Sequence, residues 1–244
     1  MNYSIIPYRI FPLGDNALTI DFGNVIQPSI NKEVIARFNQ LQLHPISGMI
    51  EAIPAYSSLT IYYDVPKLKK IIGQGKTVFD WMKEKLEVIL KEPAPEKIIA
   101  ERFVKIPVCY DNECAPDIQQ LAATKNISVE EVIQIHSSIN YKVFMLGFLP
   151  GFVYMGEVDE RIVMPRKQEP ENVVPGSVGI AGKQTGIYPL ASPGGWQIIG
   201  RTPLKLFDAE RVEPTLLKAG DTVQFYAINK KEFEQIQGTE ALKY

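Results

Sequence analysis

Residues 176–200 read Gly-Ser-Val-Gly-Ile-Ala-Gly-Lys-Gln-Thr-Gly-Ile-Tyr-Pro-Leu-Ala-Ser-Pro-Gly-Gly-Trp-Gln-Ile-Ile-Gly, and Lys183 is the only formal charge among them. Ten of the chain's 17 glycines lie between Gly147 and Gly200. Glycine allows backbone with positive φ and close approach of neighbouring segments. Because apolar and aromatic residues alternate with the glycines, this region predicts short strands joined by tight turns, with aromatic and backbone groups around a pocket.

The rest of the composition is that of an ordinary soluble protein. With 244 residues, 45% of them hydrophobic, the chain is long enough for one or two cores. The net charge of −2 gives no reason to expect nucleic acid as a partner. No apolar run approaches the roughly 20 residues that cross a bilayer, so we expect no membrane association. The N-terminus does not resemble a signal peptide, and we expect a cytoplasmic protein.

The N-terminal part of the sequence alternates between strand and helix patterns. We predict a β, α, β, β, α order, in which two helices pack on an antiparallel sheet to form a small α/β sandwich. The supporting patterns are a turn at Gly14-Asp15, a strand through Leu18, Ile20 and Phe22, a helix from about Ser29, two strands within Glu51–Tyr63, and a long helix with Thr77 as its N-cap.

A Pro-rich, charged segment from Lys91 to Glu96 predicts a boundary between an N-terminal α+β domain, residues 1–94, and a second domain, residues 95–244. The second domain is predicted to be mainly β and closed as a barrel, which removes exposed sheet edges. Its expected elements are a strand over Ala100–Val108, a helix over Pro116–Ala123, a capping box at Ser128–Glu131 that opens another helix running to His136, a strand over Thr222–Ile228 and a helix over Lys230–Ile236.

Three blocks carry a family resemblance: Gly147-Phe-Leu-Pro-Gly-Phe152, Gly179-Ile-Ala-Gly-Lys-Gln-Thr-Gly-Ile-Tyr188 and Ser192-Pro-Gly-Gly-Trp-Gln-Ile-Ile-Gly-Arg-Thr-Pro203. They resemble the family of 5-oxoprolinase B subunits, also called allophanate hydrolase subunit 1 and sporulation kinase A inhibitor. The resemblance continues over nearly the whole chain, in order. It departs from the family pattern at Val173-Val-Pro-Gly-Ser177 and at Ala115-Pro-Asp117, where the family usually has Val-Pro-x-Gly-Ser and Gly-Pro-Asp.

The resemblance implies a small α/β domain followed by a cyclophilin-like β-barrel. It further implies one component of an oxoprolinase complex, which acts with a sister C-type component and a third, A-type component to cleave 5-oxoproline to glutamate at the expense of ATP. The ATP would be a co-substrate, held by this protein or by a partner, and Mg²⁺ could accompany it. Residues 176–183 are not a Walker loop, because five residues separate Gly176 from Gly182 instead of four and Gln184 stands where Ser or Thr binds magnesium.

Candidate catalytic residues are His136, Lys183 and Arg201. Histidine titrates near neutrality and is a natural acid or base, while the two cations border the glycine-rich blocks and could hold a carboxylate or phosphate. The alternatives are a core or helix-terminal histidine, and cations that are solvated or belong to structural ion pairs. Cys109 and Cys114 are too few for a zinc site and lack neighbours that would activate a thiol, so we expect no metal ligands and no catalytic cysteine.

The candidate substrate-binding residues lie in or beside the three blocks. Polar groups in uncharged surroundings must find partners there, and large aromatics either line a pocket or fill a core. This set comprises Phe148, Gly151, Phe152, Arg166, Gln184, Thr185, Tyr188, Ser192, Gly194, Gly195 and Trp196.

Two function classes follow from the sequence. The first is a component of an ATP-dependent enzyme acting on a small lactam or amide, with a site completed by partner subunits. The second is a regulatory protein that inhibits a sensor histidine kinase through an exposed apolar surface. The second role would be insensitive to loss of His136 or Lys183. A prolyl isomerase is suggested by barrel analogy alone, which does not carry function.

Overall fold

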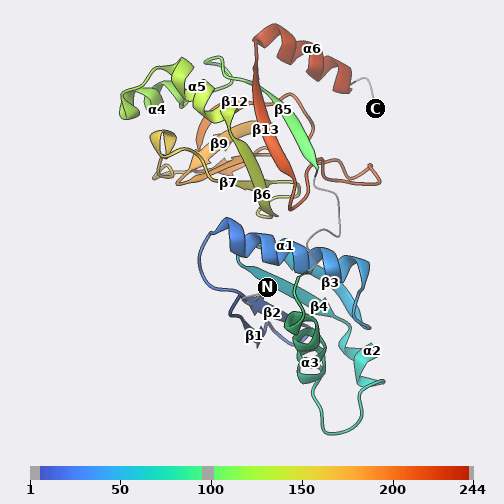
Figure 1. Cartoon of the computed structure of the whole chain (residues 1–244). Coiled ribbons are helices and arrows are strands. Elements are labelled where there is room, and N and C mark those ends of the chain that lie inside the picture. Colours follow the sequence, from blue (N-terminus) through green and yellow to red (C-terminus); the bar gives the residue numbers. More distant parts are fainter. Residues whose placement is uncertain (1–5, 95–101, 242–244) are drawn as a thin grey trace. The chain divides into compact units, whose positions relative to one another are not determined.

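A computed structural model describes residues 6–94 and 102–241 of the chain (Figure 1). The chain divides into two compact units, Met1–Ala100 and Glu101–Tyr244. The predicted boundary after residue 94 adjoins residues 95–101, which lie outside the described residues. These include Ala100, the first residue of a predicted strand. The position of that boundary therefore stays a prediction.

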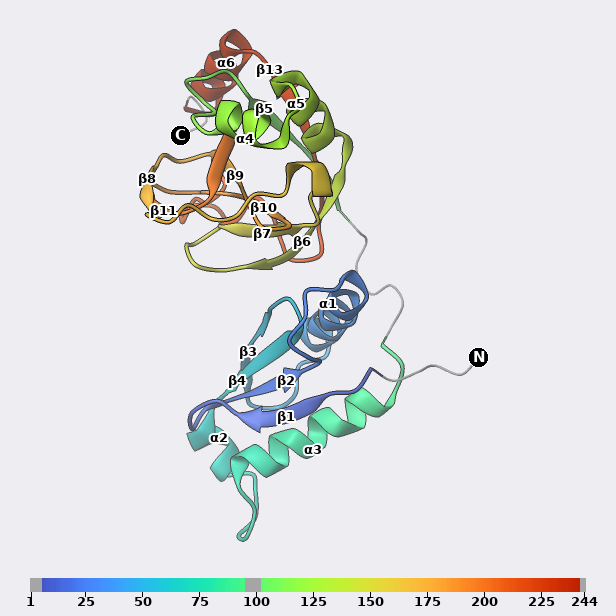
Figure 2. The same cartoon turned by 90° about the vertical axis from the view of Figure 1, so that its left-hand side faces the viewer.

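The first unit is a four-stranded antiparallel sheet packed against helices (Figure 2). The strand order is β1-β2-β4-β3, and helix α1 packs on β3 and β4 while α3 packs on β2. This arrangement confirms the predicted α/β sandwich. The elements are β1 (Arg9–Pro12), β2 (Ala17–Asp21), α1 (Pro28–Leu43), β3 (Met49–Pro54), β4 (Ser58–Tyr63), α2 (Val65–Lys69) and α3 (Val78–Lys91).

Local signals account for most of this unit. Leu18 and Ile20 point into the core, as the alternation predicted, and Thr77 caps α3 by accepting a hydrogen bond from the backbone N–H of Asp80 at 3.0 Å. Strand β1 and helix α2 were not predicted. They are four and five residues long, too short for a hydrophobic period to show in the sequence.

The second unit is built on a closed barrel, as predicted. Its strand order is β10-β7-β6-β13-β5-β12-β9, and β9 pairs with β10 to close it. Strands β13 and β5 are parallel, and the other neighbours are antiparallel. The barrel strands are β5 (Phe103–Cys109), β6 (Asn140–Leu146), β7 (Val153–Gly156), β9 (Ser177–Ala181), β10 (Gln184–Ile187), β12 (Gln197–Arg201) and β13 (Thr222–Ile228).

Shorter elements surround the barrel. A separate two-stranded sheet pairs β8 (Glu171–Val173) with β11 (Ser192–Gly194). The predicted capping box is present, and the helix it opens ends at Ser138, two residues beyond the predicted His136. The last helix is also longer than predicted, because it continues past Ile236 to Ala241. The helical elements are α4 (Ile118–Lys125), α5 (Val129–Ser138), the single-turn η1 (Glu160–Ile162) and α6 (Lys230–Ala241).

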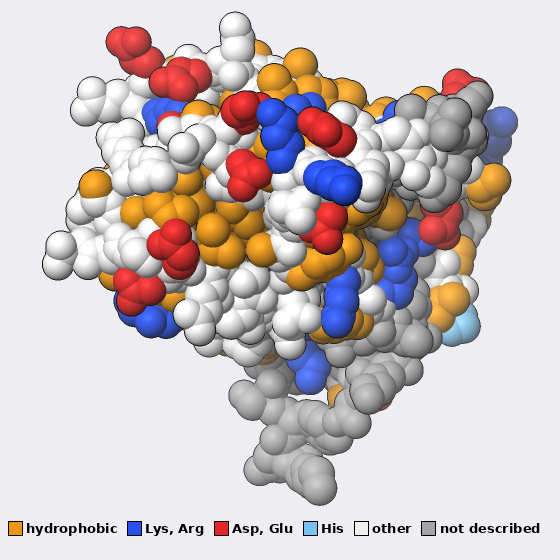
Figure 3. Space-filling view, turned by 90° about the horizontal axis from the view of Figure 1, so that it is seen from above, with side chains coloured by type: hydrophobic (Ala, Val, Ile, Leu, Met, Phe, Trp, Pro, Cys, Tyr) orange, Lys and Arg blue, Asp and Glu red, His pale blue; other side chains and the backbone are white. Residues whose placement is uncertain are grey.

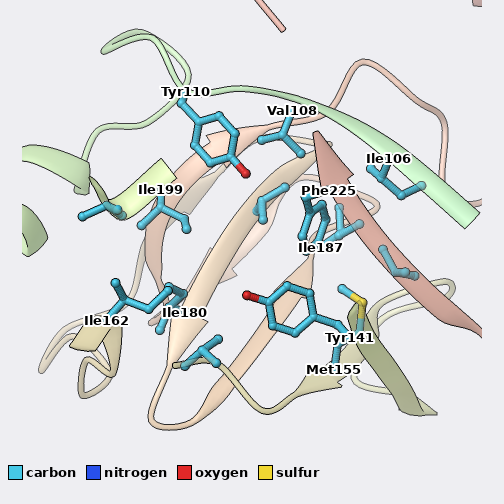
Figure 4. Close-up of a cluster of buried hydrophobic side chains, with 14 of the residues drawn as sticks. Ile106, Val108, Tyr110, Tyr141, Met155, Ile162, Ile180, Ile187, Ile199 and Phe225 are labelled. Carbon is cyan, nitrogen blue, oxygen red and sulfur yellow. The ribbon is translucent and has the colours of Figure 1, made fainter. Parts of the chain in front are cut away.

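The barrel interior is filled with side chains (Figure 4). Aliphatic residues from every barrel strand are fully or nearly fully buried there, together with Tyr110, Tyr141 and Phe225. The two tyrosine rings point into this interior (Figure 4). The barrel is therefore a packed core, and a binding site must lie on its outside or at its rim.

The surface shows no segregation of charge on the face drawn in Figure 3. There, Lys and Arg side chains lie among Asp and Glu side chains, with apolar side chains around them. Among the described residues, no helix is both long enough and apolar enough to cross a membrane.

Candidate functional site

A cavity of about 690 Å³ opens beside the barrel where the three glycine-rich blocks converge. Its walls come from the loop before β7, from β7 itself, from a segment preceding β8, from the β9–β10 turn and from the loop after β11. The lining residues are Phe148, Phe152, Tyr154, Pro165, Arg166, Pro170, Ala181, Gly182, Gln184, Tyr188, Pro193, Gly194, Gly195 and Trp196.

Phe152 organises the aromatic wall of this pocket. Its buried ring makes edge-to-face contacts with Phe148, Tyr154, Tyr188 and Trp196, at centroid distances between 4.7 and 5.8 Å. Such aromatic pairs contribute about 0.5–1.5 kcal/mol each beyond the area they bury. Phe152, Tyr188 and Trp196 are almost fully buried, so the wall is close-packed, and Phe148 is its most exposed ring.

Glycines bring the rings this close together. A Cβ on Gly194 would lie 2.6 Å from the Tyr188 hydroxyl oxygen, and one on Gly186 would lie 2.6 Å from a backbone oxygen and 3.0 Å from the Trp196 ring. No side chain fits at either position without displacing the wall. The glycine density seen in the sequence is thus explained by close packing around the pocket.

Arg166 supplies the one cation among the residues that line the pocket. Its guanidinium nitrogens lie 3.4 and 3.5 Å from the position that a Cβ on Gly195 would occupy, so the group packs over a bare backbone. Within the described residues the guanidinium has no carboxylate partner. Burial raises the pKa of Tyr154 and of Tyr188, and the nearby charge of Arg166 opposes both shifts. The pocket lining thus combines neutral aromatic side chains with one positive charge, which has no carboxylate partner in the described part of the chain.

The predicted catalytic cations do not line this cavity. Lys183 is exposed in the β9–β10 turn and pairs with Glu160. Arg201 donates from Nε to the carbonyl of Pro175 at 2.9 Å, and its guanidinium lies 5.4 Å from the ring of Phe233. The structure also places residues 176–183 in a β-hairpin rather than before a helix, consistent with the rejection of a phosphate-binding loop.

His136 lies inside the barrel, fully buried and away from the pocket. Its Nδ1 is 2.8 Å from the Tyr110 hydroxyl, its Nε2 is 3.0 Å from the Thr185 hydroxyl, and its ring stacks on Phe225 at 4.6 Å. Thr185 donates to the Gly179 carbonyl, so it accepts from His136, whose Nε2 carries the proton while Nδ1 accepts from Tyr110. Burial lowers the pKa of His136 to about 3, and the ring is neutral.

The structure therefore separates the three predicted catalytic residues and gathers most of the predicted substrate-binding ones. Three members of the latter set lie outside the pocket lining. Gly151 has a φ of +82° and packs against Phe207. Thr185 is hydrogen-bonded to His136. Ser192 lies in β11, where its buried hydroxyl has no hydrogen-bond partner among the described residues. The lining residues from the predicted set are Phe148, Phe152, Arg166, Gln184, Tyr188, Gly194, Gly195 and Trp196.

Sequence reasoning missed Tyr154 and the prolines of the pocket rim. Tyr154 lies two residues after Phe152, and in an extended segment such residues share a side, so this spacing was an available signal. Pro165 and Pro170 carried no comparable signal, because they belong to a segment distant in sequence from the blocks. Pro193 stands beside Gly194 within the third block, and that neighbourhood was its available signal.

No group of three or more His, Cys, Asp or Glu residues in the described part of the chain could hold a metal ion. Both cysteines are free thiols. Burial raises the pKa of Cys109 to about 12, which leaves this thiol protonated and unreactive at neutral pH.

Residues 8–217 match the protein family described as the carboxyltransferase domain, subdomain C and D. Since the match covers most of the chain, the protein belongs to this family. The match takes in the α/β unit from β1 onward and the barrel elements as far as residue 217, and β13 and α6 lie beyond it.

Among known proteins, the chain is similar to the B subunit of 5-oxoprolinase from Bacillus subtilis, with 45% identity over 93% of this chain and 96% of the relative. It is 50% identical to the B subunit of 5-oxoprolinase from Haemophilus influenzae over 89% of this chain and 96% of the relative. The crystal structure of TTHA0988 superposes with a TM-score of 0.73 at 33% identity and covers 87% of this chain. The match spans only 40% of that longer solved chain.

Proposed function

We propose that this protein is the B component of an ATP-dependent 5-oxoprolinase, and that its barrel-side pocket binds the lactam substrate. The relatives named as 5-oxoprolinase B subunits align over nearly their whole length with this chain. In this proposal the protein works in the cytoplasm with a sister C-type component and a third, A-type component, and 5-oxoproline is opened to glutamate as ATP is consumed.

The pocket carries the proposal. A five-membered lactam with one carboxylate is a small, flat ring with a single negative charge. The aromatic wall around Phe152 offers apolar contact for such a ring, and the unpaired Arg166 offers two parallel N–H donors for the carboxylate. Gln184 on the lining supplies an amide within the same cavity. The apolar walls and the single positive charge support a ligand of this class.

The chemistry also requires groups that the pocket does not supply. An unstrained lactam is opened economically after phosphorylation of its oxygen, which needs cations and backbone amides around a triphosphate. The lining offers one guanidinium and mostly apolar walls, a poor fit to ATP or to Mg²⁺. We therefore place the nucleotide outside this pocket and derive no step through it.

Such a pocket fits a shared site that partner subunits complete. The assignments of His136, Lys183 and Arg201 as catalytic residues remain predictions. The geometry of His136, enclosed and neutral, favours its structural alternative.

The test is 5-oxoproline-dependent ATP hydrolysis, with glutamate measured in parallel, for this protein alone and mixed with the A-type and C-type components. We expect turnover only in the full mixture. In that mixture, Arg166→Leu should raise the KM for 5-oxoproline about 10-fold or more, because a charged hydrogen-bonding pair is lost. Arg166→Lys should recover part of the loss. An intact complex without turnover, or an unchanged KM in Arg166→Leu, would contradict the proposal.

The kinase-inhibitor alternative makes a different prediction. Inhibition through a surface would persist in Arg166→Leu, since the pocket would play no part in it. No feature of the pocket favours that role, which stays a prediction from the family resemblance.

A further inference from the structure

Asp117 and Lys167 form an ion pair that joins two segments behind the pocket. Lys167 Nζ lies 2.8 Å from Asp117 Oδ2, and the two side chains are only 12% and 11% exposed. The same carboxylate oxygen accepts a hydrogen bond from the backbone N–H of Ile198 at 2.6 Å, and Asp117 N donates to the Ile198 carbonyl at 3.0 Å. Lys167 also pairs with the exposed Glu171 at 2.6 Å.

The residues 165–167, which we call the strap, carry Arg166 along the pocket. Two further hydrogen bonds hold the strap to residues 195–197, the segment that carries Trp196. Lys167 N donates to the Gly195 carbonyl at 2.8 Å, and Gln197 Nε2 donates to the Pro165 carbonyl at 3.0 Å. The two strap residues that make these bonds, Pro165 and Lys167, flank Arg166 in sequence. Their partners, Gln197 and Gly195, flank Trp196.

Among residues 6–94 and 102–241, no group forms a hydrogen bond or an ion pair with the Arg166 side chain. Its guanidinium packs over Gly195 and has no carboxylate partner among the described residues. The position of the Arg166 side chain therefore depends on where the strap lies. Arg166 lines the cavity while the neighbouring Lys167 reaches Asp117, so the two adjacent side chains of the strap face different ways.

We propose that Asp117 and Lys167 are positioning residues for the ligand site, which hold the strap against β12 so that Arg166 faces the pocket and meets an anionic group there. This inference rests on the proposed function insofar as the anionic group is the carboxylate of the lactam. A buried pair of this kind adds little net stability over an apolar pair, because desolvation offsets the attraction between the charges. Its contribution is to the geometry of the strap.

The experiment uses the full chain in a Trp81→Phe background, where Trp196 is the one tryptophan left and reports on the pocket. The test variant is Lys167→Met, and Lys167→Arg is its conservative partner. The matched control is Lys230→Met, which breaks the exposed pair with Glu113 far along the chain. Two readouts are taken: the NMR order parameter of the Arg166 Nε–H without ligand, and the affinity for 5-oxoproline and for its uncharged carboxamide from Trp196 fluorescence.

We expect Lys167→Met to lower the order parameter of Arg166 and to weaken 5-oxoproline binding about 10-fold, with little effect on the carboxamide. Lys167→Arg should recover most of both losses, and Lys230→Met should change neither. A purely structural role would weaken both compounds equally. An unchanged Arg166 order parameter in Lys167→Met would overturn the positioning role.

The outcome for the proposed function is separate. If the order parameter falls but the background protein, free and with its partner subunits, binds neither compound, the positioning role stands and the lactam site fails. If both compounds bind and Lys167→Met changes only their affinity in equal measure, the lactam site stands and the positioning role fails.

Discussion

Replacement of His136 by phenylalanine separates its structural role from a catalytic one. The ring stacks on Phe225 at 4.6 Å with an interplanar angle of 17°, and a phenyl ring keeps this contact. What the substitution removes is the acceptor for the Tyr110 hydroxyl and the donor to Thr185. Thr185 retains its hydrogen bond to the Gly179 carbonyl, so Tyr110 loses most.

The magnitude follows from these contacts. A buried hydroxyl left without a partner costs about 1–3 kcal/mol, and we expect His136→Phe to lower the free energy of unfolding of the barrel unit by about 2–3 kcal/mol. Tyr110→Phe alone should cost a similar amount, because it leaves Nδ1 without a donor. Replacing both partners removes the unsatisfied groups together, so the double variant should lose no more than about 1 kcal/mol beyond either single variant.

In a Trp81→Phe background, urea unfolding followed by Trp196 fluorescence reports on the barrel unit, and the double-mutant cycle then gives the coupling between the two side chains. We expect a coupling of about 1–2 kcal/mol that favours the pair. Additive losses, with no coupling, would refute the hydrogen-bonded network as described. Loss of turnover in a fully stable double variant would instead support an acid–base role for His136.

Three further predictions concern conformation, pH and reactivity. Gly176→Ala should destabilise the barrel by at least about 2 kcal/mol more than Gly182→Ala in thermal or urea unfolding. Both positions have positive φ, but a Cβ at Gly176 would lie 2.2 Å from a backbone oxygen, whereas the space around Gly182 is open. Equal losses of stability in the two variants would contradict this prediction. His136, whose pKa falls from 6.5 to about 3, takes up a proton in the unfolded chain before it does so in the folded one. Stability should therefore fall as the pH drops from 6.5 toward 3, by about 2 kcal/mol at pH 5, and His136→Phe should flatten this dependence between pH 5 and 7. Iodoacetamide at pH 8 should label Cys114 before Cys109, because burial raises the pKa of the Cys109 thiol to about 12. Peptide mass spectrometry measures the labelling, and equal labelling of the two cysteines would argue against the burial of Cys109.

The predicted secondary structure succeeded where the signal was local. The capping box at Ser128 and the N-cap at Thr77 are encoded within four residues, and both are present. The strand over Thr222–Ile228 agrees residue for residue, since it is a seven-residue β-rich run that follows a Gly-Asp turn. A short element such as β1 has too few residues to show a hydrophobic period in the sequence. Its pairing with β2 defines it as a strand.

The lining of the pocket was predictable in composition but not in arrangement. Gly194 and Trp196 were identified within the glycine-rich blocks and Arg166 as a cation bordering them, and all three line one pocket. The same reasoning grouped them with His136, because the sequence shows a titratable residue but not its burial. The direction of a side chain relative to the closed barrel depends on pairing between strands that are distant in sequence, such as β5 and β13.

From the sequence alone follow the two-part organisation, the barrel and the glycine-rich pocket lining, because periodicity, caps and tight turns act between near neighbours in the chain. The tertiary structure alone decided that His136 is a neutral core residue, that Lys183 and Arg201 lie outside the pocket, and that Asp117 holds Lys167 from a distant part of the sequence. The physical reason is that burial, ion pairing and the direction of a side chain are set by contacts between distant segments, which leave no pattern at any single position.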